Sequence, residues 1–346
     1  MTTRACLAVL ALTVVAAGCS SVGGPKAGAP AHHRTGGYAN LDPSIPLPPA
    51  WVRLRFFVAR VLSTTFAPRT ASFPVLAGDG RALRDNRGEP RLTWVGHSTL
   101  LLQLDGVNVL TDPQWSRRAS PVSFAGPARV TPPAPRFEDL PPIHIVVISH
   151  DHYDHLDRDT VKRLAAAHRP KFLVPLGLKA WFADIGIGDV EELDWWEART
   201  LRGLTLTCVP AQHFSGRTPW DRNRRLWSGW TIAGQTRRLY FAGDTAYFAG
   251  FKEIGARLGP FDVAAIPIGA YLPPVIMKPS HTSPEEALSA LGDVRGRIFV
   301  PIHWGTFDLA EEPLDEPPRR LQAEARRLSL GPDRVWMLRH GETRSW

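Results

Sequence analysis

The segment Ile143–Asp157, with the sequence IHIVVISHDHYDHLD, constrains the possible folds of this chain more than any other part. It opens with a short β-branched apolar run, Ile145 to Ile148, which is typical of a buried strand. Four potential metal ligands follow within six residues: His150, His152, Asp154 and His155. Imidazole and carboxylate groups are ligands that Zn²⁺ accepts at about 2.0–2.2 Å. The segment therefore predicts a metal site on a loop between a strand and a helix.

The spacing of these ligands indicates more than one ion. His150 and His152 lie two residues apart and can converge on one ion, whereas Asp154 and His155 must then point elsewhere. A loop that is rich in histidine by chance is the alternative interpretation. Three of the chain's 12 histidines within six residues, at the end of a buried strand, argue against that alternative.

The same arrangement recurs along the chain, because a potential ligand follows a predicted strand at four places. These strands are predicted at residues 145–148, 204–209, 238–241 and 299–302. The ligands that follow them are His150, His213, Asp244 and His303. Strand ends at one edge of a two-sheet sandwich bring distant residues together. The pattern therefore predicts one composite site that binds two metals.

The motif His-x-His-x-Asp-His after an apolar strand resembles the signature of the metallo-β-lactamase superfamily. The segments TWVGHSTLLLQLDGVNVLTDP, PAQHFSGRTPWDRNRRLWSGW, YFAGDT and IHWGTF resemble its branch that hydrolyses N-acyl-phosphatidylethanolamine, a phospholipase D. The match runs from about Leu92 to Phe307. This resemblance implies an α/β fold, the αββα four-layer sandwich, with the metals at one edge where the two sheets meet.

The resemblance also implies the ligand set and the cofactor. The seven implied ligands are His150, His152 and His213 for one ion, Asp154, His155 and His303 for the other, and Asp244 as the bridge. The expected cofactor is two Zn²⁺ ions, and the same ligand types also accept other divalent metals. Such a centre keeps a positive charge and should attract an anionic phosphodiester.

Three residues are expected to act in catalysis: Asp154, Asp244 and His281. Two roles stay open for His281 and for His97, namely a hydrogen bond to a metal ligand or a contact with substrate phosphate. A polar residue satisfied within a turn is the alternative for both histidines. Asp112, in the segment LTDP, is expected to support the metal loop by a hydrogen bond rather than to bind metal.

The predicted function is phosphodiester hydrolysis of the phospholipase D type, which converts N-acyl-phosphatidylethanolamine to phosphatidic acid and an N-acylethanolamine. A lactonase or another ester hydrolase of the same superfamily is the first alternative. A non-catalytic metal-binding protein of the cell envelope is the second, and the complete ligand set argues against it. The formal charge of +8 does not indicate a nucleic-acid partner, because no basic run interleaved with aromatic residues adjoins the site.

The N-terminus predicts export to the cell envelope. Residues 1–18 read as a signal peptide, with Arg4 before an apolar run that is too short to span a bilayer. The sequence Ala-Ala-Gly-Cys then resembles a bacterial lipobox, so Cys19 is expected to carry the lipid anchor. Ordinary secretion is the alternative, because the usual leucine is replaced by Ala16. Ser20 favours the outer membrane in a cell with two membranes.

The rest of the chain divides into a flexible linker, residues 19–50, and one hydrolase domain, residues 51–346. Trp51 to Leu62 is expected to form a helix; packing on the domain is favoured over a position at the lipid interface. The proline-rich loop Pro113 to Pro142 is expected to meet the lipid headgroup. Further helices are predicted at 159–168, 177–184, 284–291 and 317–328. Further strands are predicted at 92–95, 99–104, 107–110, 171–174, 227–233, 262–268 and 334–338.

Overall fold

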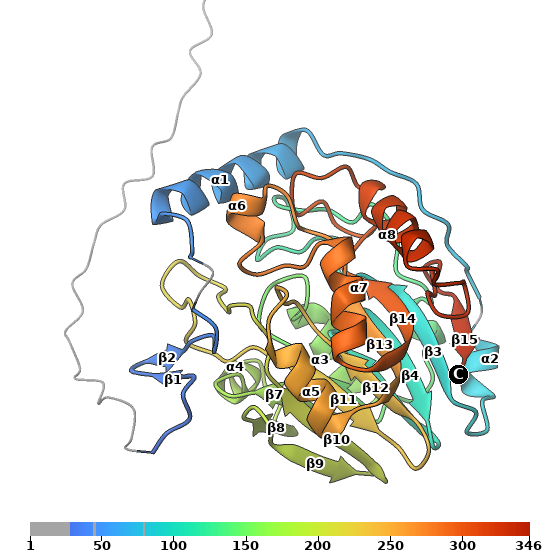
Figure 1. The fold of residues 1–346 in the computed structure, drawn as a ribbon. Coiled ribbons are helices and arrows are strands. Elements are labelled where there is room, and N and C mark those ends of the chain that lie inside the picture. Colours follow the sequence, from blue (N-terminus) through green and yellow to red (C-terminus); the bar gives the residue numbers. More distant parts are fainter. Residues whose placement is uncertain (1–27, 44–45, 79) are drawn as a thin grey trace, which may run out of the picture.

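The computed structural model describes residues 28–43, 46–78 and 80–346, and two β-sheets form its centre (Figure 1). The predicted signal peptide and Cys19 lie outside the described residues. One sheet contains, in spatial order, β15 (Thr343–Ser345), β3 (Arg91–Gly96), β4 (Thr99–Leu104), β5 (Val107–Thr111), β6 (Ile145–Val147), β7 (Lys171–Pro175) and β8 (Val190–Leu193). The other contains β14 (Gly296–Ile302), β13 (Phe261–Pro267), β12 (Arg238–Phe241), β11 (Gly229–Ala233), β10 (Leu204–Val209) and β9 (Ala198–Leu201).

Helices cover the outer faces of both sheets, so the predicted αββα sandwich is confirmed. The seven-stranded sheet packs against α3 (Arg158–Ala167) and α4 (Lys179–Asp184). The six-stranded sheet is covered by α5 (Gly250–Leu258), α7 (Pro284–Asp293) and α8 (Glu316–Arg327). The remaining helices are α1 (Ala50–Phe66), α2 (Arg81–Arg84), α6 (Pro274–Met277) and the 3₁₀ turn η1 (Phe137–Asp139).

Strand β4 illustrates why the sequence forms layers. Leu100, Leu102 and Leu104 belong to the core that both sheets share, whereas Leu101 packs with the helices on the outer face. Successive side chains of a strand point to opposite faces, so an all-apolar strand is buried on both sides. Asp105 and Gly106 then connect β4 to β5 with φ angles of 51° and 77°. Both angles suit the tight hairpin turn that the Asp-Gly pair predicts.

The parallel strands carry the metal loops. β5, β6 and β7 run parallel, as do β12, β13 and β14. Their carboxyl ends therefore lie at one edge of the sandwich. The ligand loops after β6, β12 and β14 all start at this edge, as the sequence predicts.

Some expectations need correction. Residues 334–338 do not form a strand: Val335 makes one isolated bridge to Phe299, and the chain then turns, with Leu338 N–H donating to Trp336 O. The last strand is β15 instead, antiparallel to β3. The helix α5 was not predicted, because its two glycines disfavour helix. Gly255 is required there, since a Cβ would lie 2.3 Å from the backbone oxygen of Asp293.

The predicted helix near Trp51 exists as α1, and it contacts the domain, but most of its large apolar side chains do not. Thr64 is its only buried residue. Six large apolar side chains of α1 are exposed: Trp51, Leu54, Phe57, Val58, Leu62 and Phe66. The side that faces the domain is mixed, because Phe56 packs against an apolar cluster there and Arg60 forms an ion pair with Asp308. In the described residues, no helix has the length and apolar character needed to cross a bilayer.

The expected linker 19–50 is also too long. From His32 onward the chain packs on the domain, through a short hairpin of β1 (His33–Arg34) and β2 (Gly37–Tyr38). We call residues 31–43 the N-terminal arm. Asn40 and Asp42 continue its contact by hydrogen bonds to the loop after β10. The glycine- and proline-rich composition suggested a linker here, because composition gives no information about contacts with residues far along the chain.

Candidate metal centre

Three histidines form the first ligand group. His150 follows β6, His152 lies two residues on, and His213 follows β10. The His152 Nδ1 atom lies 2.8 Å from His150 Nε2 and 3.2 Å from His213 Nε2. The Nδ1 atoms of His213 and His150 point away from the group and contact other residues. His213 Nδ1 lies 2.8 Å from Ser280 O, and His150 Nδ1 lies 2.8 Å from Ser149 Oγ. These contacts aim both Nε2 atoms into the group.

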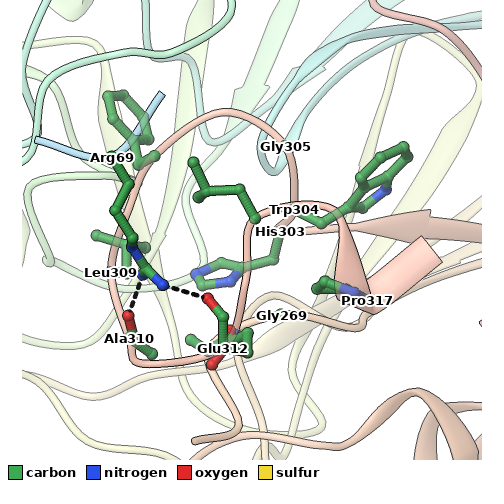
Figure 2. Close-up of a pocket in the computed structure, with 12 residues that line it drawn as sticks. Arg69, Gly269, His303, Trp304, Gly305, Leu309, Ala310, Glu312 and Pro317 are labelled. Carbon is green, nitrogen blue, oxygen red and sulfur yellow. Dashed lines mark hydrogen bonds between the residues drawn. The ribbon is translucent and has the colours of Figure 1, made fainter. Parts of the chain in front are cut away.

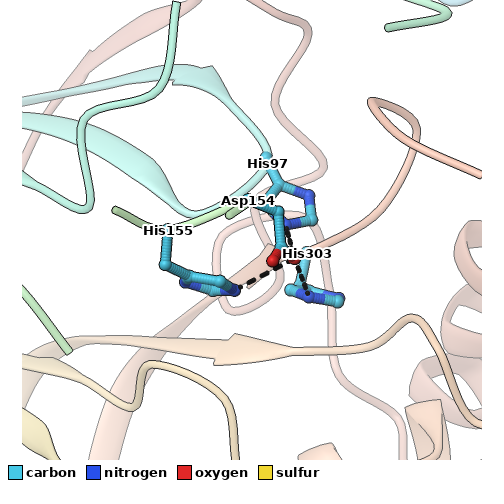
Figure 3. Close-up of side chains that lie close together, drawn as sticks. All are labelled: His97, Asp154, His155 and His303. Atoms are coloured by element: carbon cyan, nitrogen blue, oxygen red, sulfur yellow. Dashed lines mark hydrogen bonds and ion pairs between the residues drawn. The ribbon is translucent and has the colours of Figure 1, made fainter. Parts of the chain in front are cut away.

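A second group adjoins the first and surrounds the carboxyl group of Asp154 (Figure 3). Asp154 Oδ2 lies 3.3 Å from His155 Nε2, 3.3 Å from His303 Nε2 and 2.9 Å from His97 Nε2. Asp154 and His155 come from the loop after β6, and His303 follows β14 directly. Residues more than 140 positions apart in the sequence thus meet at one point.

Asp244 lies between the two groups. Its Oδ2 atom is 3.0 Å from His303 Nε2 and 3.2 Å from His155 Nε2 in the second group. The same atom is 3.8 Å from His213 Nε2 in the first group. Asp244 follows β12 and is 3% exposed. The structure therefore brings together all seven ligands that the sequence singled out.

Two further residues hold the ligands in place. Asp112 Oδ2 lies 2.7 Å from His155 Nδ1, and Asp112 Oδ1 accepts the Ser149 N–H at 2.6 Å. Burial and the neighbouring His303 lower the pKa of His97 to about 3, so His97 is neutral and its Nε2–H donates to Asp154. Such contacts fix the orientation of metal ligands.

The backbone is strained at three residues of the metal centre. The φ angles are 52° at His97, 34° at Asp112 and 61° at His303, in a region that non-glycine residues rarely adopt. The His303 N–H donates to His97 O at 3.0 Å, which links two of the strained residues. Strain of this kind collects at functional sites, where the surrounding fold maintains it.

His281 adjoins the centre without joining either ligand group. It precedes α7, and its Nδ1 atom lies 3.9 Å from Asp244 Oδ2. Burial lowers the pKa of His281 to about 4, although the neighbouring Asp244 opposes the shift. Its imidazole is therefore neutral at physiological pH. His281 Nδ1 has no hydrogen-bond partner among the described residues.

The charges and orphaned atoms of the centre fit metal ions. Burial alone would raise the pKa of Asp244, but His155 and His303 hold that pKa well below its usual value. Two ionised carboxylates, the partly buried Asp154 and the buried Asp244, thus lie close together around His303 Nε2. Asp244 Oδ1 and His303 Nδ1 are buried without a hydrogen-bond partner among the described residues. Buried polar groups of native proteins are normally paired, and divalent cations would pair these.

Sequence reasoning missed Asn40, which supports the first group. Asn40 Nδ2 donates to His213 O at 2.9 Å, and the His213 N–H donates to Asn40 Oδ1 at 3.1 Å. The indole N–H of Trp227 donates to the same oxygen at 3.0 Å. Asn40 lies in a segment whose composition resembles a linker, so no local pattern pointed to it.

Two cavities lie near the centre. A small one, about 20 Å³, is lined by His303, Trp304, Arg69 and Glu312 among others (Figure 2). That volume suits about one water molecule and not a substrate. A larger one, about 930 Å³, lies between the metal loop at Tyr153 and the proline-rich loop at Arg117. The larger cavity adjoins the metal loop, although none of the seven potential ligands lines it.

Fold and site together define a metal-dependent hydrolase, and the chain belongs to the β-lactamase superfamily, whose domain model matches residues 107–304. N-acyl-phosphatidylethanolamine-hydrolyzing phospholipase D 1 of Caenorhabditis elegans is 50% identical over 228 residues, 63% of this chain and 64% of that protein. A metal-dependent hydrolase of Methanopyrus kandleri is 30% identical over 266 residues, 73% of this chain and 98% of that protein.

A solved structure shares the fold. Igni18, a metallo hydrolase from Ignicoccus hospitalis, superposes with a TM-score of 0.57 and 24% identity, over 74% of this chain and 98% of that chain. The match to the nematode phospholipase D covers less than two thirds of that protein's length. Its substrate therefore guides a proposal for this chain and does not establish one.

Proposed function

We propose that this protein is a dinuclear zinc phosphodiesterase that hydrolyses N-acyl-phosphatidylethanolamine to phosphatidic acid and N-acylethanolamine. The observation that carries the proposal is the position of Asp244 between two complete ligand groups. Seven ligands are too many for one tetrahedral ion. The 50% identity to a nematode enzyme that is named for this reaction supports the choice of substrate.

When bound, two zinc ions would supply Lewis acidity and activate water for attack on phosphorus. The residues of the chain hold and orient this centre. Asp154 and Asp244 provide its negative charge, and the N–H of His97 keeps the Asp154 carboxyl group in place. Neutral His281, 3.9 Å from Asp244, can donate an N–H to a phosphoryl oxygen of the substrate. In this role His281 stabilises charge that develops in the transition state.

The exposed face of α1 supports a lipid substrate. Trp51, Leu54, Val58, Leu62 and Phe66 recur every three or four residues and therefore share one side of the helix. Trp51 is 66% exposed and Phe66 80% exposed. Amphipathic helices of this kind lie in the headgroup region of a membrane with the apolar side inward.

The contacts of α1 bring its exposed apolar face near the loops that carry the potential metal ligands. Phe56 packs against a cluster that includes Met277 and Ala310. Met277 ends α6, which lies beside α1 and precedes His281 (Figure 1). The N–H of Gly126, in the proline-rich loop, donates to Thr65 Oγ1 of α1 at 2.9 Å. Phe124 of the same loop is 75% exposed. A membrane bound by α1 and Phe124 would hold lipid headgroups next to the metal loops.

We also propose that Cys19 is lipidated and anchors the protein in the cell envelope, in the outer membrane where the cell has two. A single acyl chain binds membranes weakly, whereas two signals together anchor stably. The lipid anchor and α1 would act as such a pair. A Cys19→Ser variant that still sediments with membranes after salt and carbonate washing would contradict the lipid anchor.

The test of the reaction is hydrolysis of the lipid in ¹⁸O-labelled water, with mass spectrometry of the products. Attack on phosphorus places the label in phosphatidic acid and none in N-acylethanolamine. Label in a free fatty acid would instead indicate ester or amide hydrolysis, in line with a lactonase-type enzyme. The Asp244→Asn variant serves as the control for contaminating lipases, because it should release neither product.

A further inference from the structure

A second cluster of potential ligands lies outside the metal centre, where the N-terminal arm meets the loop after β8. His32 Nε2 is 2.6 Å from Asp194 Oδ1, and His33 Nε2 is 2.8 Å from Asp194 Oδ2. The three ligand atoms lie within 4.8 Å of one another. His32 and His33 are adjacent in the arm, and both contact the carboxyl group of Asp194. That residue lies 162 positions after His32 and 161 positions after His33.

We propose that His32, His33 and Asp194 bind a divalent cation of the zinc class, which fastens the N-terminal arm to the domain. This arm site is separate from the dinuclear centre and does not rest on the proposed reaction. Two imidazoles and one carboxylate leave one position of a tetrahedral ion open. The His33 side chain is 27% exposed, so water can reach the arm site and fill that position.

The spacing of the ligand atoms supports this assignment. Ligand atoms of one tetrahedral zinc ion lie about 3.3 Å apart, given bond lengths near 2.0 Å. The first ligand group of the metal centre has spacings of 2.8 and 3.2 Å. In the arm site the spacings are 2.6 and 2.8 Å, from the two histidines to the two oxygens of Asp194, so each histidine would have to move away from the carboxyl group by about 0.5–0.7 Å.

Neighbouring groups orient the ligands of the arm site. The His32 ring stacks on Trp195 with the ring centroids 4.2 Å apart, and His32 is 5% exposed. The His33 ring meets Tyr38 edge-on at 5.2 Å. Asp194 Oδ1 also accepts the Trp195 N–H at 2.7 Å. A ligand set that is held by outer contacts loses less conformational entropy when it binds an ion.

The weakness of the hairpin gives the ion a purpose. β1 and β2 have two residues each, and isolated hairpins of that size are unstable in water. Small elements of this kind usually need a staple such as a metal.

The arm site also affects the dinuclear centre through the same segment. Asn40 follows the hairpin and binds the backbone of His213, a proposed ligand. An ion at His32 and His33 would hold the arm closed and so keep Asn40 in contact with His213. Two hydrogen bonds from the histidines to Asp194, without an ion, are the competing explanation.

The variant His33→Gln separates the two explanations, because a glutamine amide can still donate a hydrogen bond to Asp194 but is a poor zinc ligand. The full chain should bind one equivalent of Zn²⁺ more than His33→Gln, as measured by elemental analysis after equilibrium dialysis. The control His168→Ala removes a histidine that belongs to none of the ligand clusters among the described residues. Its zinc content should equal that of the unchanged protein.

Trypsin cleavage after Arg34, within the hairpin, gives a readout that is independent of activity. At a free zinc concentration of about ten times the dissociation constant, linkage predicts about tenfold slower cleavage in the unchanged protein. Zinc should not slow cleavage in His33→Gln. Equal zinc content in both proteins, or equal protection of both by zinc, would overturn the arm site and leave hydrogen bonds as the explanation.

Discussion

At the scale of single residues, the carboxyl group of Asp244 has the largest expected effect. It contacts histidines of both ligand groups and is buried, so no solvent molecule easily replaces it. Asp244→Asn should reduce kcat/KM by more than the roughly 10–100-fold that is typical for residues behind the ligands. It should also lower the metal content of the purified protein.

Asp112→Asn is the matched comparison for Asp244→Asn. Asp112 is equally buried but lies behind His155, and its substitution should cost about 10–100-fold in activity. Activity assays and elemental analysis of both variants, expressed with added zinc, measure the difference. If Asp244→Asn keeps near-normal turnover, Asp244 is not a bridge between two ions.

Asn40 is the residue whose role only the structure revealed. Asn40→Ala removes three hydrogen bonds, two with the His213 backbone and one with the Trp227 indole. Each is worth about 0.5–1.5 kcal/mol, so the free energy of unfolding should fall by about 1.5–4.5 kcal/mol. Denaturation by urea measures this change.

The metal affinity of Asn40→Ala should fall as well, by about tenfold, because His213 loses its support. A competition assay with a chelator measures that affinity. Asn86→Ala also removes three local hydrogen bonds, but in an exposed turn far along the chain from His213, so it is the control and should leave the metal affinity unchanged. An Asn40→Ala protein with unchanged metal affinity would show that the arm does not position His213.

At the scale of elements, α1 presents its apolar residues outward. Burial of a large apolar side chain contributes about 1.5–3 kcal/mol, so Leu54→Glu together with Phe66→Ser should weaken binding to lipid vesicles more than tenfold. Sedimentation with vesicles of N-acyl-phosphatidylethanolamine measures the binding. Turnover of a short-chain, monomeric substrate should stay unchanged, since these residues do not contact the metal centre.

The exposed Leu328, at the end of α8, offers a control for charge and hydrophobicity. Leu328→Glu makes the same chemical change as Leu54→Glu but outside α1. It should leave vesicle binding as it is. Equal loss of binding in both variants would mean that α1 is not the membrane-binding element.

At the scale of the whole molecule, the metal ions are expected to stabilise the fold. The centre joins loops from both sheets, and without cations it would bury two carboxylates among partly unpaired histidines. Ions that bind only the folded state at 100 times their dissociation constant add about 2.7 kcal/mol per site. A chelator should therefore lower the melting temperature by several degrees, and added zinc should restore it. A melting temperature that does not respond to the chelator would contradict metal binding at this centre.

The sequence by itself determined the fold class and which residues are the candidate ligands of the metal centre. The signals for both are local: apolar runs of strand length, an Asp-Gly turn at residues 105–106, and a ligand-type residue just beyond each strand. Parallel strands place their carboxyl ends at one edge, so the strand pattern also implied that His150, Asp244 and His303 would meet. The order of apolar and polar residues along the chain predicts the strands, because a strand face that is buried must consist of apolar residues.

Only the tertiary structure decided how distant partners meet. The contacts of Asn40 with His213, and of His32 and His33 with Asp194, span more than 160 residues within a segment that looks like a linker. The orientation of α1 is recorded only in its contacts, in which Phe56 and Arg60 face the domain while Trp51, Leu54 and Phe66 are exposed. Such contacts depend on the packing of the whole chain, and neither periodicity nor composition records them.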